Sequence, residues 1–563
     1  MRRSAPARIG SAAALVLLAA CASTPAGRGG EAGGPLRHGG GGSGSSREER
    51  VLLTAFNDIT GVAASRRFVF ASTTEALGIL DRQFNSWLTP LAQAQGFPSG
   101  QPSSLAADPV EDAVWILTPG QVLYYRASTN YVTSTLVPGV VDAIFFDRRD
   151  PLGGAYLNVG GQLLLASRGG TVTPVSGAMA PPYSARQGPV GLRELYARFP
   201  SLQNFAALYT RDEQMQSWPI SAGAEPPDNL SEVWLGTRGG GLFKVDPNFH
   251  QSQHYPYGLL ETGAGALALA ADGIWVAGLG RGFGRGGISF ASADLQQWRW
   301  LEGPLSRPLA GARAYRMDVR ADAAWIASDR GAVRMDTRNP NNVRSWSGTN
   351  GLPADLALSV VATPAGAWVG TGRGLVFIAD DGRSRGGAPR GAVSQALAEG
   401  TAVRALLLTG DTLWIGSDAG LLLLRGSAPD SQPRRAAAAA QEPRLLRAIR
   451  GISRSDSEVV IATQEDLLRF NLRSGALLPR YDAVRLSAVG TISSLAVDAR
   501  TIWVAGAGGV LMILRNSGVS RFLSIPADVP AEVYDMKLDD EFVWIATRQG
   551  VLRLRRLADG TIP

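Results

Sequence analysis

The stretch "AWVGTGRGLVFI", residues 367–378, decides the fold because versions of it recur along the chain. In each version two runs rich in β-forming residues flank a short turn that contains glycine, which is the pattern of a β-hairpin. Clear copies begin at Val233, Ala324, Leu413, Ile502 and Val543. All of them carry tryptophan in the second place. The sequence therefore predicts one repeated hairpin rather than a single globular core.

One bulky anchor residue marks each copy of the repeat. The anchors are Trp115, Trp234, Trp275, Trp325, Trp368, Trp414, Trp503 and Trp544 in eight copies, and Val69, Tyr156 and Val460 in three weaker ones. Most neighbouring anchors are 41–50 residues apart, and the interval from Tyr156 to Trp234 is 78. An apolar run precedes each hairpin and a weaker strand follows it. Four strands per period of this length predict the blades of an all-β propeller, with the anchors packed in its core.

The run "NGLPADLALSVVATPAGAWVGTGRGLVFI", residues 350–378, resembles the two-component regulator propeller repeat. The resemblance extends through imperfect copies over roughly residues 51–560. It implies a β-propeller, and in that family such propellers often serve as periplasmic sensor modules ahead of a membrane helix and a kinase. This chain stops about nine residues after the last repeat, so we expect a module that senses or binds but does not signal alone.

Eleven copies exceed the four to eight blades of an ordinary ring. We therefore predict two rings, with one oversized ring as the alternative. The last copy, Val543 to Leu554, has no room for a fourth strand before Pro563. A spare apolar run at Val51 to Phe56 precedes the first copy and is predicted to complete the last blade, which hides its edge. One ring then contains both ends of the repeat region, and the other ring is inserted within it.

Residues 178–216 interrupt the repeat with a helical pattern. Leu192, Leu195, Tyr196 and Phe199 stand at i, i+3, i+4 and i+7, so one face of the predicted helix is apolar. Pro200 is expected to end this helix. Its expected role is to cover a blade or to fill the gap between rings, and the functional alternative is a lid or a partner-docking helix.

The N-terminus predicts export. Residues 1–21 have a basic start and a short apolar run, and they end in "LAAC", which resembles the lipobox of bacterial lipoproteins. The resemblance implies cleavage before Cys21, the only cysteine, and its lipidation; the alternative is an ordinary signal peptide with a chance cysteine. Ala22 follows, and in that family this pattern points to the outer membrane. Residues 22–50 are rich in glycine and serine and predict a flexible tether to the repeat region, residues 51–563.

Motifs for chemistry are weak in this chain. "GFGRGG", residues 282–287, matches the spacing of a dinucleotide-binding loop, but "ISF" follows where that motif needs a helix, so we interpret it as a lengthened hairpin turn. Of the three histidines, His250 and His254 are four apart and lack a third metal ligand, while His38 lies in the tether. We therefore predict no enzyme activity, no catalytic residue, no cofactor and no metal site.

Arginines recur in the turns of the repeated hairpins. The candidate ligand-binding residues are Arg238, Arg281, Arg285, Arg330, Arg373 and Arg548. Gathered on one rim of a ring, they could bind carboxylate, sulfate or phosphate groups; the alternative is that they are ordinary solvated turn residues. The formal net charge is only +7 over 563 residues, and three of the arginines precede the apolar run, so no nucleic-acid partner is expected.

The sequence as a whole predicts an outer-membrane lipoprotein that faces the periplasm or the cell surface. It is held to the membrane through a lipid anchor at Cys21 and displays a non-enzymatic β-propeller. The propeller is expected to bind a protein partner or an anionic or glycan ligand. The alternatives are a scaffold lipoprotein of an envelope assembly machinery, and a propeller lyase or hydrolase.

Overall fold

A computed structural model of the chain describes residues 49–563, apart from residues 99–100, 148, 150–152, 176–180, 183, 189–190, 230, 281–285, 303–306, 381–397, 427–431, 475 and 482–485. Residues Ser45–Pro563 form one compact unit. Cys21 and most of the predicted tether lie outside the described residues. Within the described part, the chain is built almost entirely of antiparallel β-sheets, eleven in number, most with four strands.

The first four sheets in chain order, residues 61–255, are called the four-sheet group. Their strands are β2 (Gly61–Ala64), β3 (Phe68–Ser72), β4 (Ala76–Asp81) and β5 (Ser86–Ala92); β6 (Ser104–Ala107), β7 (Ala113–Thr118), β8 (Gln121–Arg126) and β9 (Tyr131–Leu136); β10 (Val141–Phe146), β11 (Gly154–Val159), β12 (Gln162–Ser167), β13 (Val172–Pro174) and β14 (Arg186–Gly188); β15 (Ile220–Ala224), β16 (Val233–Thr237), β17 (Leu242–Asp246) and β18 (Gln251–Tyr255).

The other seven sheets, residues 264–555 with β1, are called the seven-sheet group. Their strands are β19 (Ala264–Ala270), β20 (Gly273–Gly278), β21 (Gly287–Ser292) and β22 (Trp298–Glu302); β23 (Ala314–Arg320), β24 (Ala323–Ser328), β25 (Gly331–Asp336) and β26 (Val343–Trp346); β27 (Ala357–Thr363), β28 (Gly366–Thr371) and β29 (Gly374–Ala379); β30 (Val403–Thr409), β31 (Thr412–Ser417), β32 (Gly420–Arg425) and β33 (Arg434–Arg435); β34 (Gly451–Arg454), β35 (Glu458–Ala462), β36 (Leu467–Asn471) and β37 (Leu477–Tyr481); β38 (Ile492–Val497), β39 (Thr501–Gly506), β40 (Gly509–Leu514) and β41 (Ser520–Ser524); β42 (Val533–Leu538), β43 (Phe542–Thr547), β44 (Gly550–Arg555) and β1 (Arg50–Leu53).

Each predicted anchor lies on the second strand of its own sheet. Seven of the eight anchor tryptophans are buried, and Trp414 is partly buried. They pack between neighbouring sheets: Trp503, for example, contacts a cluster that continues into β42, β43 and β44. The prediction that the anchors are core residues is confirmed, because a large flat ring fills the space between two twisted sheets.

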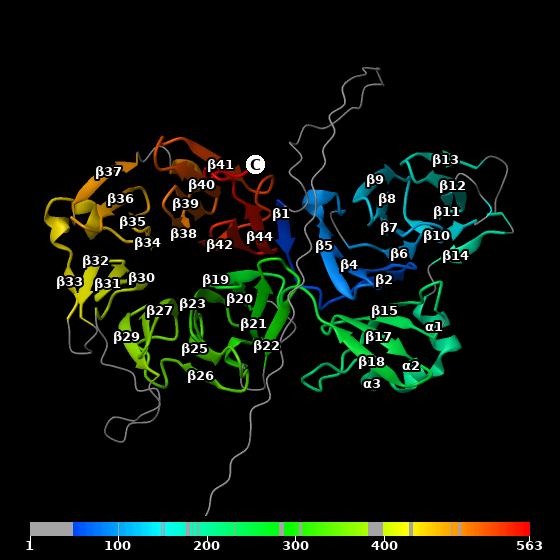
Figure 1. The fold of residues 1–563 in the computed structure, drawn as a ribbon, viewed down its shortest axis with the longest axis horizontal. Helices are drawn as coiled ribbons and strands as arrows, with labels where there is room; N and C mark the ends of the chain where they lie inside the picture. Colours follow the sequence, from blue (N-terminus) through cyan, green and yellow to red (C-terminus); the bar gives the residue numbers. More distant parts are fainter. Residues whose placement is uncertain are drawn as a thin grey trace, which may run out of the picture. The chain divides into compact units, whose positions relative to one another are not determined.

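The predicted pairing of the N-terminal strand with the last sheet is also confirmed. In Figure 1 the blue β1 lies beside the red β44, and the register pairs Val51 with Arg553 and Leu53 with Val551. Gly550 makes this approach feasible, since its φ is +135° and an added Cβ would overlap the carbonyl oxygen of Leu53. The first and last strands of the repeat region therefore share one sheet, and the four-sheet group lies between them in the sequence.

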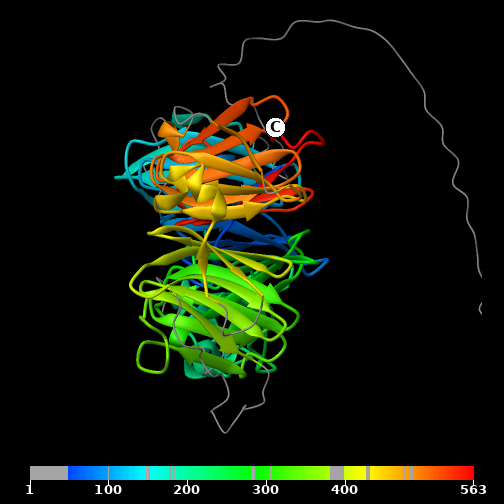
Figure 2. The same ribbon diagram turned by 90° about the vertical axis from the view of Figure 1, so that its left-hand side faces the viewer.

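The first strands of the seven-sheet group contact one another in cyclic order. β19 contacts β23, then β23 contacts β27, and the series continues through β30, β34 and β38 to β42, which contacts β19. Figure 1 shows these strands turned toward a common middle, and Figure 2 shows the same group from its side. In the four-sheet group β2 contacts both β6 and β15.

The helical pattern of residues 178–216 forms three short helices. These are α1 (Leu192–Arg198), α2 (Pro200–Asn204) and α3 (Ala206–Tyr209). Leu195 is fully buried, and Leu192, Tyr196 and Phe199 pack with it against the sheet of β15 to β18, so the insertion covers a sheet. Pro200 ends α1 as predicted and also begins α2, a position where proline's missing N–H costs nothing. The same insertion supplies β14, which makes its sheet five-stranded.

Candidate binding site

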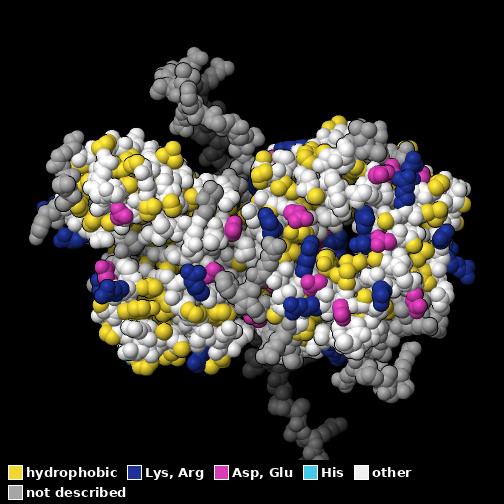
Figure 3. All heavy atoms as spheres, turned by 180° about the vertical axis from the view of Figure 1, so that it is seen from behind, with side chains coloured by type: hydrophobic (Ala, Val, Ile, Leu, Met, Phe, Trp, Pro, Cys, Tyr) yellow, Lys and Arg dark blue, Asp and Glu magenta, His cyan; other side chains and the backbone are white. Residues whose placement is uncertain are grey.

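Two adjoining cavities lie among the first strands of the seven-sheet group. The larger, here the inner chamber, has a volume of about 410 Å³ and is lined by β19, β23, β27, β30, β34, β38 and β42. The smaller, here the vestibule, has a volume of about 220 Å³ and lies where these strands begin. Arg316 and Arg404 line both cavities. On the face shown in Figure 3, Lys and Arg side chains gather around the middle of this group.

Bulges at the start of the first strands build the wall of the vestibule. The pairing register of six first strands skips one residue, and the skipped residues are Gly265, Tyr315, Leu358, Arg404, Ser493 and Tyr534. All six line the vestibule. A bulge bends a strand and changes the direction in which one residue points. Because the bulge stands at the same position of six first strands, one residue from each of these sheets faces the vestibule. The seventh sheet contributes Arg450, directly before β34.

Arg313 is held between two aromatic rings at the wall of the vestibule. Its guanidinium carbon lies 5.1 Å from the ring centre of Tyr315 and 4.8 Å from that of Tyr534. Its Nε is buried and has no hydrogen-bond partner among the described residues. Stacking on tyrosine fixes the plane of a guanidinium without neutralising its charge. Arg313 is therefore a cation in a fixed position whose Nε–H makes no hydrogen bond to the described residues.

Two further arginines share one carboxylate beside the vestibule. Arg404 donates from Nε and Nη2 to Asp418, at 2.7 and 3.0 Å, and Arg450 Nη1 lies 3.7 Å from the same group. The hydrogen bonds from Arg404 lower the pKa of Asp418. The Nε of Arg450 is buried and also lacks a hydrogen-bond partner within the described chain. No described residue that lines the vestibule is a carboxylate, so positive charge is in excess there.

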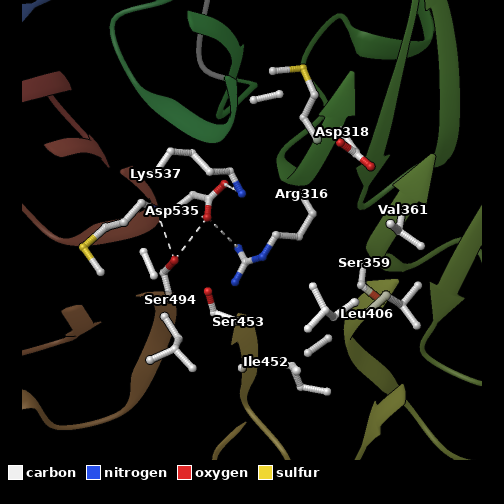
Figure 4. A pocket seen from close by; sticks show the side chains of 18 of the residues that line it. Arg316, Asp318, Ser359, Val361, Leu406, Ile452, Ser453, Ser494, Asp535 and Lys537 are labelled. Carbon is white, nitrogen blue, oxygen red and sulfur yellow. Dashed lines mark hydrogen bonds and ion pairs between the residues drawn. The ribbon is translucent and has the colours of Figure 1, made fainter. Parts of the chain in front are cut away.

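Arg316 forms the floor of the vestibule. Its Nη1 donates to the carbonyl oxygens of Tyr315 and Tyr534, at 2.7 and 3.2 Å, and its Nη2 donates to that of Ser493 at 2.6 Å. Nη1 also lies 3.8 Å from Oδ1 of the buried Asp535. Figure 4 shows the Arg316 side chain reaching toward Asp535 and Ser494. These bonds join β23 to β38 and β42 and separate the vestibule from the inner chamber.

The two acidic residues that line the inner chamber, Asp318 and Asp535, have hydrogen-bond donors within the described chain. Asp535 accepts hydrogen bonds from the Leu267 N–H at 3.0 Å and the Ser494 hydroxyl at 3.1 Å, and Lys537 Nζ lies 3.7 Å away (Figure 4). Asp318 accepts from the Ala362 N–H at 2.7 Å, and burial raises its pKa. The inner chamber is thus lined by both acidic and basic residues, whereas the charged residues that line the vestibule are all arginines.

The four predicted turn arginines that the structure describes lie outside these cavities. Arg238, Arg330, Arg373 and Arg548 are exposed and stand in the turns between the second and third strands of their sheets, as predicted. Arg238 lies 3.7 Å from Asp58, and Arg330 donates to the Ala310 carbonyl at 2.9 Å. Arg281, Arg285 and Cys21 fall outside the described residues. Whether the turn arginines bind a ligand stays a prediction; the vestibule uses arginines at the start of first strands instead.

The sequence contained a signal for these other arginines that the turn pattern obscured. Arg316, Arg404 and Arg450 all stand within the first residues of a first strand or directly before it, in three different copies of the repeat. An alignment of first strands, rather than of hairpin turns, brings Arg404 and Arg450 into one column and places Arg316 one position later.

The two candidate histidines have separate partners. His250 Nδ1 lies 2.6 Å from the Tyr209 hydroxyl, whereas His254 lies between the Glu213 carboxylate and the Gly240 carbonyl. Among the described residues no group of three potential metal ligands is present. The glycine-rich segment leads from β20 into its antiparallel partner β21, as the hairpin interpretation predicted, although residues 281–285 of the turn itself are not described.

Comparisons with known proteins give no family. No family model and no curated protein matches the chain. Among solved structures, it is similar to the extracellular domain of a putative one-component system from B. thetaiotaomicron, with a TM-score of 0.41 and 11% identity over 90% of this chain and 71% of that one. It is also similar to virginiamycin B lyase from Staphylococcus aureus, with a TM-score of 0.41 and 15% identity over 53% of this chain and 96% of that one. None of the helices in the described part is long and apolar enough to cross a membrane.

Proposed function

We propose that this chain is a binding module whose seven-sheet group forms a seven-bladed propeller with an anion receptor at its vestibule. The cyclic contacts of the first strands support the ring, and the four-sheet group is inserted as a second, smaller propeller. Arg313 is the observation that carries the function. A guanidinium stacked between Tyr315 and Tyr534, with a buried Nε that has no partner, is set to receive an anionic oxygen.

The size and charge of the vestibule define the ligand class. About 220 Å³ accommodates one carboxylate, sulfate or phosphate group, while the rest of the ligand extends outward. Arg313 and Arg450 approach this space from different sheets, so a group with two or three anionic oxygens can bind both. An acidic glycan or an acidic segment of a protein partner carries such a group. The receptor is sensor-like and performs no chemistry on its ligand.

The proposed location is the cell envelope. Lipidation of Cys21 would hold the module on the outer membrane, facing the periplasm or the cell surface, and residues 22–50 would act as the tether. The scaffold and lyase alternatives are not favoured by a specific contact: no histidine is among the described residues that line the vestibule or the inner chamber.

The test is titration calorimetry of the full chain with inorganic phosphate and with sulfate at low ionic strength. We expect saturable binding that Arg313→Ala weakens by about tenfold or more, the size of one lost charge-assisted hydrogen bond. Arg373→Ala is the matched control, because this exposed turn arginine lies outside the vestibule. Equal losses of affinity in both variants would contradict a site confined to the vestibule and would implicate the hairpin turns. Unchanged affinity in Arg313→Ala would refute the proposal that the vestibule binds the anion.

A further inference from the structure

A third cavity lies within the four-sheet group and is independent of the vestibule. Its volume is about 580 Å³, and β2, β6, β10, β14 and β15 all contribute to its wall or rim. Much of the wall consists of small side chains, namely Ala63, Ala64, Ala106, Ala107 and Ala224. These short side chains, from β2, β6 and β15, leave space between three of the four sheets that larger side chains would fill.

The inserted strand β14 closes one side of this cavity. It pairs with β10 on the edge that faces the middle of the group, with Phe146 opposite Arg186 and Ile144 opposite Gly188. An added Cβ at Gly188 would lie 3.0 Å from the Phe146 ring, so glycine allows β14 to lie close to that ring. The alanines, Gly188 and Phe146 thus form the apolar part of the wall, and polar and charged side chains make up most of the rest.

Glu225 brings a buried carboxylate to this wall. Its side chain is only 6% exposed, and it forms an ion pair through Oε2 with Arg198 at the end of α1. Its other oxygen, Oε1, is buried and has no hydrogen-bond partner among the described residues. A buried carboxylate oxygen without a donor loses its hydration and gains nothing in return. Glu225 is among the residues that line the cavity, so a donor that enters there and displaces this side chain by a small rotation can reach the oxygen.

The other acidic groups at this cavity already have donors. Asp108 accepts two hydrogen bonds from Arg168, at 2.8 and 3.0 Å, and one from the Trp115 indole at 3.1 Å. Asp147 accepts from the Ser184 hydroxyl at 2.5 Å and from the Arg149 N–H at 2.9 Å. Glu225 Oε1 is therefore the acceptor that a ligand can satisfy.

We infer that this cavity is a second binding site, for a small ligand that carries an ammonium group on an apolar body. The ammonium donates a charge-assisted hydrogen bond to Glu225 Oε1, which is stronger than a bond from a neutral hydroxyl. The apolar body lies against the alanines and Phe146 and removes their surface from water. The site lies in a different sheet group from the vestibule and selects the opposite charge, so it does not depend on the anion receptor.

The test compares three probes with similar bodies: phenethylamine, phenethyl alcohol and 3-phenylpropionate. Binding to the full chain is measured by titration calorimetry. We expect phenethylamine to bind at least about tenfold more tightly than the alcohol, because only the amine is charged. Arg149 and Arg186 also line the cavity, so tighter binding of 3-phenylpropionate would show that the site selects acids and would overturn the proposal.

Two variants locate the binding. Glu225→Gln should reduce phenethylamine affinity about tenfold, whereas Glu399→Gln, an exposed carboxylate of the seven-sheet group, should not. Ala107→Phe fills the cavity while Glu225 stays intact, and it should also reduce phenethylamine affinity. This variant provides the test if a thermal scan shows that Glu225→Gln is unfolded. Phenethylamine binding that survives both substitutions refutes the site. Arg313→Ala must leave this binding unchanged, which separates the result from that of the vestibule.

Discussion

Arg316 on β23 donates a 2.6 Å hydrogen bond from Nη2 to the carbonyl oxygen of Ser493 on β38. The two residues are 177 positions apart, and their strands belong to sheets that are not neighbours in the sequence. The same guanidinium reaches the carbonyl oxygen of Tyr534 on β42. One side chain thus joins three first strands across the middle of the seven-sheet group, where backbone pairing between sheets is absent from the described strands.

Replacing Arg316 should loosen this connection. Arg316→Met removes the donors of three carbonyl oxygens and should lower the free energy of unfolding by about 1–3 kcal/mol. Urea unfolding followed by circular dichroism measures the loss. Arg320→Met, at the exposed far end of β23, is the control and should change stability little. A similar loss in both variants would show that the contacts of Arg316 add nothing specific.

Gly550 should be indispensable for closing the last sheet. In Gly550→Ala the new Cβ would overlap the Leu53 carbonyl oxygen, and a φ of +135° is strained for alanine. We expect β1 to detach, which amide hydrogen exchange would detect as lost protection at residues 50–53. Gly410→Ala serves as the control because Gly410 has a φ of +55° and open space around its Cα. Unchanged protection of β1 in Gly550→Ala would contradict the structure.

The anchor tryptophans should differ in energetic weight according to their burial. Trp503 is fully buried, so Trp503→Ala should cost about 3–5 kcal/mol of unfolding free energy through lost contacts and a cavity. Trp414 is only partly buried, so Trp414→Ala should cost less. Chemical denaturation of both variants provides the comparison. An equal or reversed order would mean that the space between sheets is not filled as described.

Asp418 should weaken anion binding at the vestibule, since it occupies the donors of Arg404 and lies near Arg450. Asp418→Asn removes this competing charge, so the affinity for phosphate at pH 7 should rise several-fold, about as much as one surface ion pair is worth. Calorimetry at low salt measures the change. An unchanged affinity would indicate that the anion does not contact Arg404 or Arg450.

The same residue predicts a pH dependence of stability. The pKa of Asp418 is lowered from 3.8 in the folded protein, chiefly by hydrogen bonds from Arg404, so its ionised form stabilises the fold. This contribution is present above pH 3.8 and is lost as the pH falls through the lowered value. The stability difference between the natural chain and Asp418→Asn should therefore shrink on acidification below pH 3.8. A difference that grows on acidification would reverse the assigned sign.

Local patterns made the sheets predictable. Alternating apolar residues, glycine at the turns and an anchor residue on each second strand, tryptophan in eight of eleven, are short-range signals, and the eleven anchors correspond to eleven described sheets. The closing strand at Arg50–Leu53 was predictable because an apolar run without a partner matched a sheet that lacked a strand. The helix of Leu192–Arg198 followed from the 3.6-residue period of its apolar face.

Sequence by itself therefore determined the repeated sheet, because hairpins form between residues that are close along the chain. It also indicated how the first and last strands meet, because one apolar run lacked a partner and one sheet lacked a strand. Only the tertiary structure decided the sites. The vestibule gathers single bulged residues from six sheets, together with neighbouring arginines, and Glu225 is notable only because one of its oxygens is buried without a partner among the described residues. Turn arginines shared a visible motif, whereas Arg313 and Arg450 lie 137 positions apart and reach one cavity only once the first strands are packed together. Pairing between neighbouring strands follows from local sequence patterns. The grouping of charged residues from distant strands depends on how those strands pack in the tertiary structure.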